Sequence, residues 1–347
     1  MTTNDKINAR KQRWTAFLDN TGPRFTRLIH FDESGAPPRL FHRANRRELL
    51  EHTKREYAKM LGQLEWLDDD RVPCPNGRNV FTGTEIFAEA MGCRTHCAED
   101  KMPFALPLVR TASEAAGLKT PDWSMTPLHD LLADAVALRA ELGGEIHGAL
   151  KLPDIQTPMD IAALVWDKNE FFPAMIEEPE AVKDLARKAK DLLFGFLDEW
   201  FRLFGPGHVA HFPDYYMPRG VTVSEDEIGS VGTGMFYEFF LPELVEMSER
   251  YGGLGMHCCA DSKRHWDGFK EIPNLRLLNL APRCFKVEEA YAFFAGHTAQ
   301  FHGYHVGLAP DSDLSRLPQG ARAVIEGNAA TKDEALRLAE KMARLCG

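Results

Sequence analysis

The densest group of metal-binding side chains in this 347-residue sequence is His257-Cys258-Cys259, which follows the apolar stretch Leu254-Gly-Met256. Residues two positions apart in a β-strand point to the same side. His257 and Cys259 therefore converge if strand geometry continues through both. Imidazole and thiolate are ligands that Zn2+ favours, and a catalytic zinc site keeps one coordination position open. The spacing predicts such a site; the alternative is a buried cysteine pair beside a hydrogen-bonded histidine, because free cysteine is commonly buried.

The elements around this pair are predicted from the sequence patterns on either side of it. Residues 235–247 are predicted to form a helix, and a strand is expected to end near His257. A short helix is expected from His265, followed by a second strand over 272–280. Helices that alternate with strands are typical of a parallel sheet, so the pair is predicted to lie at the end of a barrel strand.

Three segments carry a resemblance to a known family. The segment Phe236-Tyr-Glu-Phe-Phe-Leu-Pro242, the strand ending in His257-x-Cys259, and Leu275-Arg-Leu-Leu-Asn279 resemble the uroporphyrinogen decarboxylase superfamily, with a likeness over residues 80–345. The His-x-Cys is similar to the zinc motif of its cobamide-dependent methyltransferases. The resemblance implies a single (β/α)8 TIM barrel over 1–347, with 1–80 as an N-terminal helical extension. It also implies methyl transfer between a small, for example methoxy, compound and a corrinoid (cobalamin) on a separate protein.

A tight zinc site needs a third protein ligand, and here the sequence departs from the family. The methyltransferases supply a second cysteine near the last strand, where this chain reads Ala323-Val-Ile-Glu326-Gly-Asn328. Cys284, which follows the strand over 272–280, is the first candidate for the ligand, Glu326 the second and His302 the third. His302 and His305 are expected at the mouth of the intervening strand, where they could also bind substrate.

Two other loops are predicted to contribute to a substrate pocket. Asp154 and Gln156 follow a predicted strand over 146–153, and the active site of such a barrel is built from the loops after the strands. The alternative is that this segment only caps the helix that starts at Met159. Tyr215 and Tyr216, which lie in a loop with a methionine and an arginine, are typical of an aromatic wall in a binding site.

Acidic residues follow the next predicted strand, Val221-Thr-Val-Ser, as Glu225-Asp226-Glu227. The resemblance places a functional aspartate after this strand, so Asp226, with Glu225 beside it, is the candidate catalytic acid. Such a carboxyl group could protonate or orient an oxygen leaving group. The alternative is a solvated acidic turn.

Composition narrows the classes of partner. The net charge of -10 argues against nucleic-acid binding, which depends on clustered lysine and arginine. No signal peptide and no apolar run of about 20 residues is present, so a cytoplasmic protein without a membrane span is expected. Seven cysteines, an odd number, do not indicate a disulfide framework. A homodimer is compatible with the sequence. The rival functions are a porphyrinogen-type decarboxylase, whose N-terminal arginine motif is missing, and a barrel that binds metal or corrinoid without catalysis.

Overall fold

The computed structural model describes residues 2–31, 46–75, 83–97, 103–142, 148–281, 285–302 and 308–346. The helices are α1 (Thr3–Leu18), α2 (Arg46–Gln63), α3 (Glu85–Ala90), α4 (Ala112–Gly117), α5 (Pro127–Glu141), α6 (Pro158–Val165), α7 (Lys168–Glu177), α8 (Pro179–Phe204), α9 (Thr233–Met235), α10 (Leu241–Tyr251), α11 (Trp266–Phe269), α12 (Val287–Phe293) and α13 (Lys332–Cys346). A π-helical turn at Phe236–Phe240 joins α9 to α10. The strands are β1 (Phe25–Phe31), β2 (Arg94–His96), β3 (Phe104–Leu106), β4 (His208–Val209), β5 (Tyr216–Met217), β6 (Val221–Ser224), β7 (Leu254–Cys258), β8 (Leu275–Leu280), β9 (Ala299–Gln300) and β10 (Arg322–Ala329).

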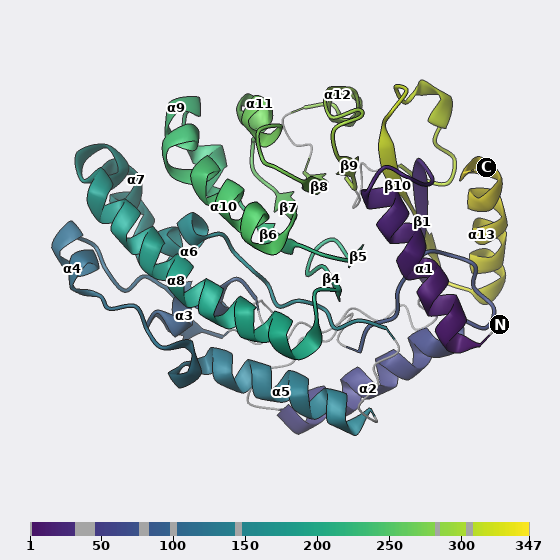
Figure 1. Cartoon of the computed structure of the whole chain (residues 1–347), viewed down its shortest axis with the longest axis horizontal. Helices are drawn as coiled ribbons and strands as arrows, with labels where there is room; N and C mark the ends of the chain where they lie inside the picture. Colours follow the sequence, from purple (N-terminus) through teal and green to yellow (C-terminus); the bar gives the residue numbers. More distant parts are fainter. Residues whose placement is uncertain are drawn as a thin grey trace.

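The centre of the molecule is a parallel sheet of six strands in the order β1-β10-β9-β8-β7-β6. Helices α10 to α13 follow the outer side of this sheet, and both chain termini lie at the same end of the molecule (Figure 1). Residues 1–80, expected as an extension, supply β1, which pairs with β10 along its whole length. The fold is therefore mixed α/β and compatible with a TIM-like barrel, although the described residues form an open sheet and not a closed eight-stranded barrel.

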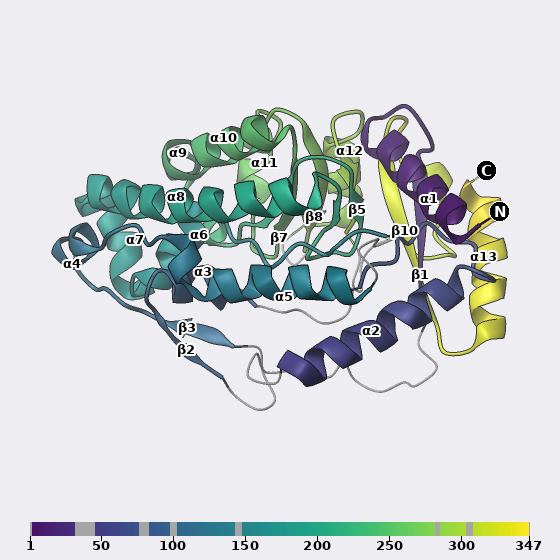
Figure 2. The ribbon, with the colours of Figure 1, turned by 60° about the horizontal axis from the view of Figure 1, so that its bottom comes forward.

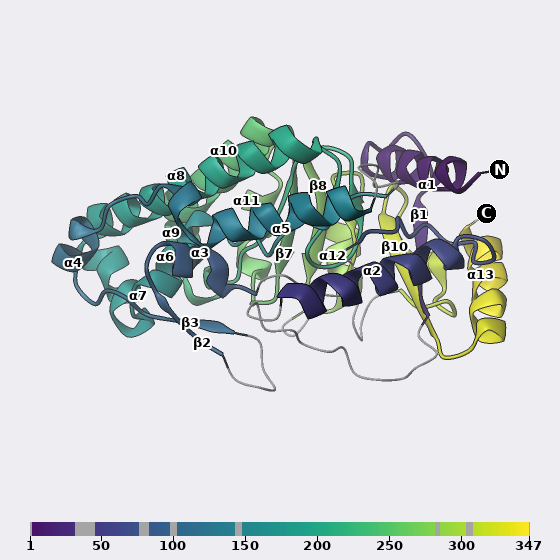
Figure 3. The same ribbon diagram turned by 90° about the horizontal axis from the view of Figure 1, so that it is seen from below.

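Other elements cover the open side of the sheet or project from it. Helices α2 and α5 lie together away from the six strands, and β2 and β3 form an antiparallel hairpin at the edge of the molecule (Figure 2). The same hairpin projects outward in the view from below (Figure 3). No helix in the described ranges has both the length and the apolar character needed to cross a membrane.

Side-chain alternation divides each strand into an outer and an inner face. On β7, Leu254, Met256 and Cys258 join the main hydrophobic cluster with residues of α10, whereas Gly255 and His257 face the other way. A Cβ atom at Gly255 would lie 1.9 Å from the Tyr215 hydroxyl oxygen, so only glycine allows this close approach. His257 therefore lies on the same face of β7 as Gly255, two residues further toward the carboxyl end of the strand than the point that Tyr215 approaches.

Helix α1 closes the end of the sheet where the strands begin. Its Trp14 is fully buried, and its ring lies 5.9 Å from that of Tyr215. Arg322, the first residue of β10, donates to backbone oxygens at the end of α1, and Arg276 of β8 pairs with Asp19. Because α1 covers the amino ends of the strands, the carboxyl ends are left to form a site.

Candidate metal and substrate site

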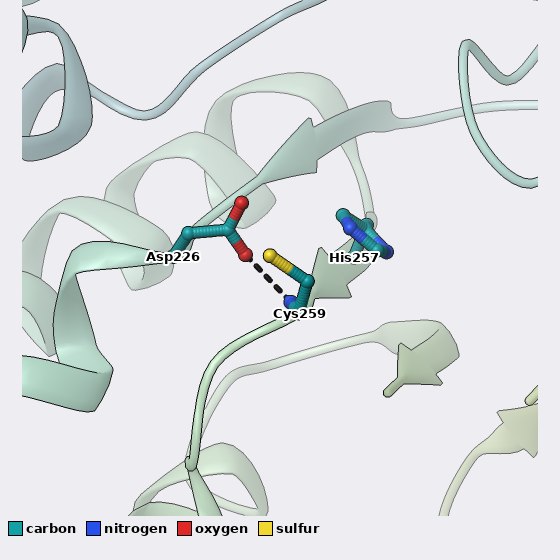
Figure 4. A group of neighbouring side chains, drawn as sticks. All are labelled: Asp226, His257 and Cys259. Atoms are coloured by element: carbon teal, nitrogen blue, oxygen red, sulfur yellow. Dashed lines mark hydrogen bonds between the residues drawn. The ribbon is translucent and has the colours of Figure 1, made fainter. Parts of the chain in front are cut away.

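Three potential metal ligands meet at the carboxyl ends of β6 and β7. Ligand atoms of Asp226, His257 and Cys259 all lie within 4.8 Å of one another. Strand register explains the meeting, since Ser224 is paired with His257, and both Asp226 and Cys259 lie two residues further along their chains. The Cys259 sulfur points toward the Asp226 carboxylate (Figure 4). Asp226, expected as a separate catalytic acid, thus lies within reach of an ion held by His257 and Cys259.

Hydrogen bonds fix the orientation of two of these three residues. His257 Nδ1 donates to Asn279 Oδ1 at 2.5 Å, and Asn279 Nδ2 in turn donates to the backbone oxygen of Phe301. The hydrogen bond to Phe301 fixes the orientation of the Asn279 amide, whose oxygen therefore faces His257 Nδ1. Nε2 of His257 is then the nitrogen with a free lone pair. The Cys259 backbone N–H donates to Asp226 Oδ1 at 2.6 Å, which leaves the second carboxylate oxygen for another partner.

The donor set fits zinc. One imidazole nitrogen, one thiolate and one carboxylate oxygen are all ligand types that Zn2+ accepts. A metal-bound histidine regularly donates its other ring N–H to a hydrogen-bond acceptor, and Asn279 is that acceptor for His257. Three protein ligands leave room for substrate at the fourth position, as in catalytic zinc sites.

The other expected ligands are placed differently. Glu326 does not belong to this group, because its strand, β10, is separated from β7 by two strands. Its carboxylate pairs instead with His30 Nε2 at 2.7 Å. His302 is fully buried and bonded through both nitrogens, to the Leu280 N–H and to Gln300 Oε1, and burial lowers its pKa to about 3. Cys284 and His305 lie outside the described residues, so their assignments stay predictions.

Glu225 lies behind the site and not in it. Side chains alternate along β6, so Glu225 points outward to α6 while Asp226 points inward. Its carboxylate accepts from Thr157 Oγ1 at 2.5 Å, and the side chain has no exposed surface. Burial, followed by the charge of Asp160, raises the pKa of Glu225 well above its ordinary value. A direct role of Glu225 on substrate is not supported by this position.

Asp160 of α6 holds the turn that carries Asp226. Its two carboxylate oxygens accept the backbone N–H groups of Asp226 at 2.9 Å and of Glu227 at 3.0 Å. Its own N–H donates to the Thr157 hydroxyl, which caps α6. Burial, with the charges of the neighbouring acids, raises the pKa of Asp160 to about 7. A buried acceptor on α6 thus positions the Asp226 turn, a role that the sequence did not indicate.

His257 belongs to a row of paired residues that crosses neighbouring segments of the sheet and leads to a second polar group, Asp154 and Gln156. Gln156 is bridged to Ser224, Ser224 pairs with His257, and His257 pairs with Asn279. Gln156 Nε2 donates to Asp154 Oδ1 at 2.8 Å, and both side chains are buried. Asp154 and Gln156 therefore lie on the same rim as the three potential ligands, where the sequence placed a substrate pocket.

His211 is a polar residue of this rim that the sequence analysis did not single out. Its Nε2 lies 3.1 Å from Asp154 Oδ2. Burial alone would raise the pKa of Asp154, but the charge and hydrogen bond of His211, the hydrogen bond of Gln156 and the charge of His257 together hold that pKa below its usual range. Asp154 is thus an ionised carboxylate that orients His211. The His208-x-x-His211 sequence was visible, but not the fold of the β4–β5 hairpin that brings it to Asp154.

The two tyrosines occupy unlike positions. Tyr215 is buried in the inner cluster with Trp14 and Leu28, and burial raises its pKa. Tyr216 is half-buried, with Lys11 Nζ 5.5 Å from its ring centre. Both tyrosines therefore contact α1 or its neighbours. The aromatic ring beside the three potential ligands is instead Phe212, which packs edge-on against His257 at 4.9 Å and is partly exposed.

Comparisons with known proteins support the fold. Neither a family model nor a curated protein matches the sequence. A solved structure of a methyltransferase from Methanosarcina mazei is similar, with a TM-score of 0.63 and 11% sequence identity, over 96% of this chain and 99% of that chain. The likeness covers nearly all of both chains, so the protein shares the fold of that methyltransferase.

Proposed function

We propose that this protein is a zinc-dependent methyltransferase that moves a methyl group between a small methylated substrate, such as a methoxy compound, and a corrinoid on a partner protein. The observation that carries the proposal is the convergence of Asp226, His257 and Cys259 where β6 and β7 end. The shared fold with a methyltransferase agrees with it. The resemblance to the cobamide-dependent methyltransferases supplies the corrinoid and the closed (β/α)8 barrel as parts of the proposal, and a cytoplasmic location is proposed with them.

Each residue of the site has a distinct task in this proposal. His257 would hold zinc through Nε2, Cys259 through its sulfur and Asp226 through the carboxylate oxygen that does not accept from Cys259. When bound, zinc would supply Lewis-acid activation of the substrate heteroatom. Asn279 keeps His257 in the required tautomer, and Asp160 keeps the Asp226 turn in place. The exposed edge of Phe212 would form an apolar border for the substrate.

The proposal is tested by zinc content and methyl transfer in the same protein samples. The wild type should hold about one zinc per chain, and it should methylate cob(I)alamin from a panel of methoxy compounds, followed by visible absorption. H257A, C259S and D226N should each lose zinc and activity together. Matched controls are C97S and H129A, since Cys97 is exposed and the His129 side chain is 58% exposed.

Three results would contradict the proposal. Wild-type protein that is free of zinc yet transfers methyl groups at full rate would remove the metal from the function. Release of CO2 from a porphyrinogen, without methyl transfer, would favour the decarboxylase. A protein that binds zinc stoichiometrically but transfers no methyl group from any tested compound would favour the binding protein.

A further inference from the structure

The proposed reaction has a proton requirement that the three potential ligands do not meet. When a thiol or alcohol is methylated, its S–H or O–H bond breaks and a carbon–heteroatom bond forms. The cobalt–carbon bond of the methylcorrinoid breaks, and its electron pair stays on cobalt. One proton is therefore released for each methyl group transferred, and one must be supplied in the reverse direction. A group beside the substrate is needed to carry this proton.

Most polar groups on the inner rim are already engaged. His257 uses Nδ1 for Asn279, and Asp226 accepts from the Cys259 N–H. His30 accepts from Arg71 at Nδ1 and donates to Glu326 from Nε2. His302 is likewise bonded through both ring nitrogens. None of these four side chains has a ring nitrogen or oxygen that is free for the proton once zinc is held.

His211 differs from them. Its Nε2 is bound to the buried carboxylate of Asp154, whereas its Nδ1 is buried without a hydrogen-bond partner among the described residues. An ionised carboxylate accepts from Nε2–H, so the lone pair of the neutral ring is at Nδ1. A buried nitrogen without a partner has lost its hydrogen bond to water and gained none in return. A substrate hydroxyl or thiol that reached Nδ1 would supply this hydrogen bond.

The pair also lies next to the three potential ligands. Asp154 is two residues before Gln156, in the row that runs through Ser224 to His257. Phe212, which follows His211, packs against the His257 ring. The charge of His257 also acts on Asp154, so this carboxylate lies close to both His211 and His257 of β7. A substrate held by the three ligands would therefore be bordered by His211.

We propose that His211, oriented by Asp154, is the catalytic acid–base group that takes up the proton of the thiol or alcohol substrate at Nδ1 and returns it in the reverse direction. The proposal rests on the methyltransferase function proposed above. It assigns the proton to a histidine that takes no part in holding zinc. Asp154 acts as a positioning residue, because its carboxylate accepts from Nε2–H and so places the lone pair of the neutral ring at Nδ1.

The number of protons released on substrate binding tests this assignment without any measurement of turnover. Zinc-loaded protein is titrated with 2-mercaptoethanol at pH 8 by calorimetry, in two buffers of different ionisation enthalpy. A thiol that binds to zinc loses its proton. In the wild type this proton should stay on His211, so that about zero protons per bound thiol reach the buffer. In H211Q, whose amide can still donate to Asp154, about one proton should be released.

The outcomes separate the two proposals. Release of about one proton per thiol by the wild type would overturn the role of His211, even if no variant folds. Equal release by the wild type and H211Q would also overturn it. Absence of zinc from the wild type, measured before the titration, would instead overturn the proposed function on which it rests. H129Q is the matched control, and it should release as few protons as the wild type.

Discussion

Substitution of Asp160 tests whether α6 positions the candidate metal site. Asp160→Ala removes both oxygens that accept the backbone N–H groups of Asp226 and Glu227. Both donors are partly buried, so each one left without a partner costs about 1–2 kcal/mol, the lower part of the range for a buried donor. The free energy of unfolding should therefore fall by about 2–4 kcal/mol. Because the Asp226 turn loses its anchor, zinc affinity should also fall by about 10- to 100-fold, as for other outer-shell residues.

Urea denaturation of the zinc-free protein measures the first effect, and competition with a chromophoric chelator measures the second. Asp191→Ala is the matched control, since its side chain is 50% exposed and pairs with Arg187 on the helix surface. It should change the free energy of unfolding by less than about 1 kcal/mol. An Asp160→Ala protein with wild-type zinc affinity would refute the positioning role, whatever its stability.

Three further predictions concern the hydrogen bond of Asn279 to His257, the pH dependence of stability, and the packing of α1 against the sheet. Asn279→Ala should weaken zinc binding by about 10- to 100-fold in the chelator competition, because His257 loses its acceptor; unchanged affinity would argue against Nε2 ligation. The raised pKa of Asp160, about 7 against 3.8, means that the folded protein keeps a proton that the unfolded chain releases. Its contribution to stability is thus fully present below about pH 4 and is lost progressively as the pH rises to about 7. Urea midpoints of zinc-free protein between pH 5 and 8 should accordingly depend less on pH in Asp160→Asn than in the wild type, and parallel curves would contradict this. Trp14→Ala should lower the free energy of unfolding by about 3–5 kcal/mol with zinc content unchanged, and a parallel loss of zinc would show that α1 also shapes the site.

Local patterns were enough to predict much of the fold. The strand that ends at His257 and the helix before it are confirmed as β7 and α10, since apolar alternation and the glycines after Tyr251 mark them. Helix α7 was not predicted. The predicted strand over 146–153 is represented in the described residues by an isolated bridge at Lys151.

The candidate site depended on information that the sequence does not display. The spacing of His257 and Cys259 follows from the period of a strand, and this part was predicted. The addition of Asp226 to that pair requires the register of β6 against β7, which is set by packing along the whole sheet. The pairing of His211 with Asp154 joins residues from separate segments. Tyr215 looked like a wall residue because its loop position could not reveal that α1 covers it.

X-ray absorption at the zinc K-edge tests the central claim most directly. The wild type is loaded with one equivalent of zinc and measured without substrate. The proposed site predicts one sulfur ligand at about 2.3 Å, with the remaining ligands nitrogen or oxygen at about 2.0–2.2 Å. The sulfur should disappear in Cys259→Ser. Two sulfur ligands in the wild type would contradict Asp226 as the third ligand and indicate a second cysteine such as Cys284, and failure to bind zinc would contradict the metal site itself.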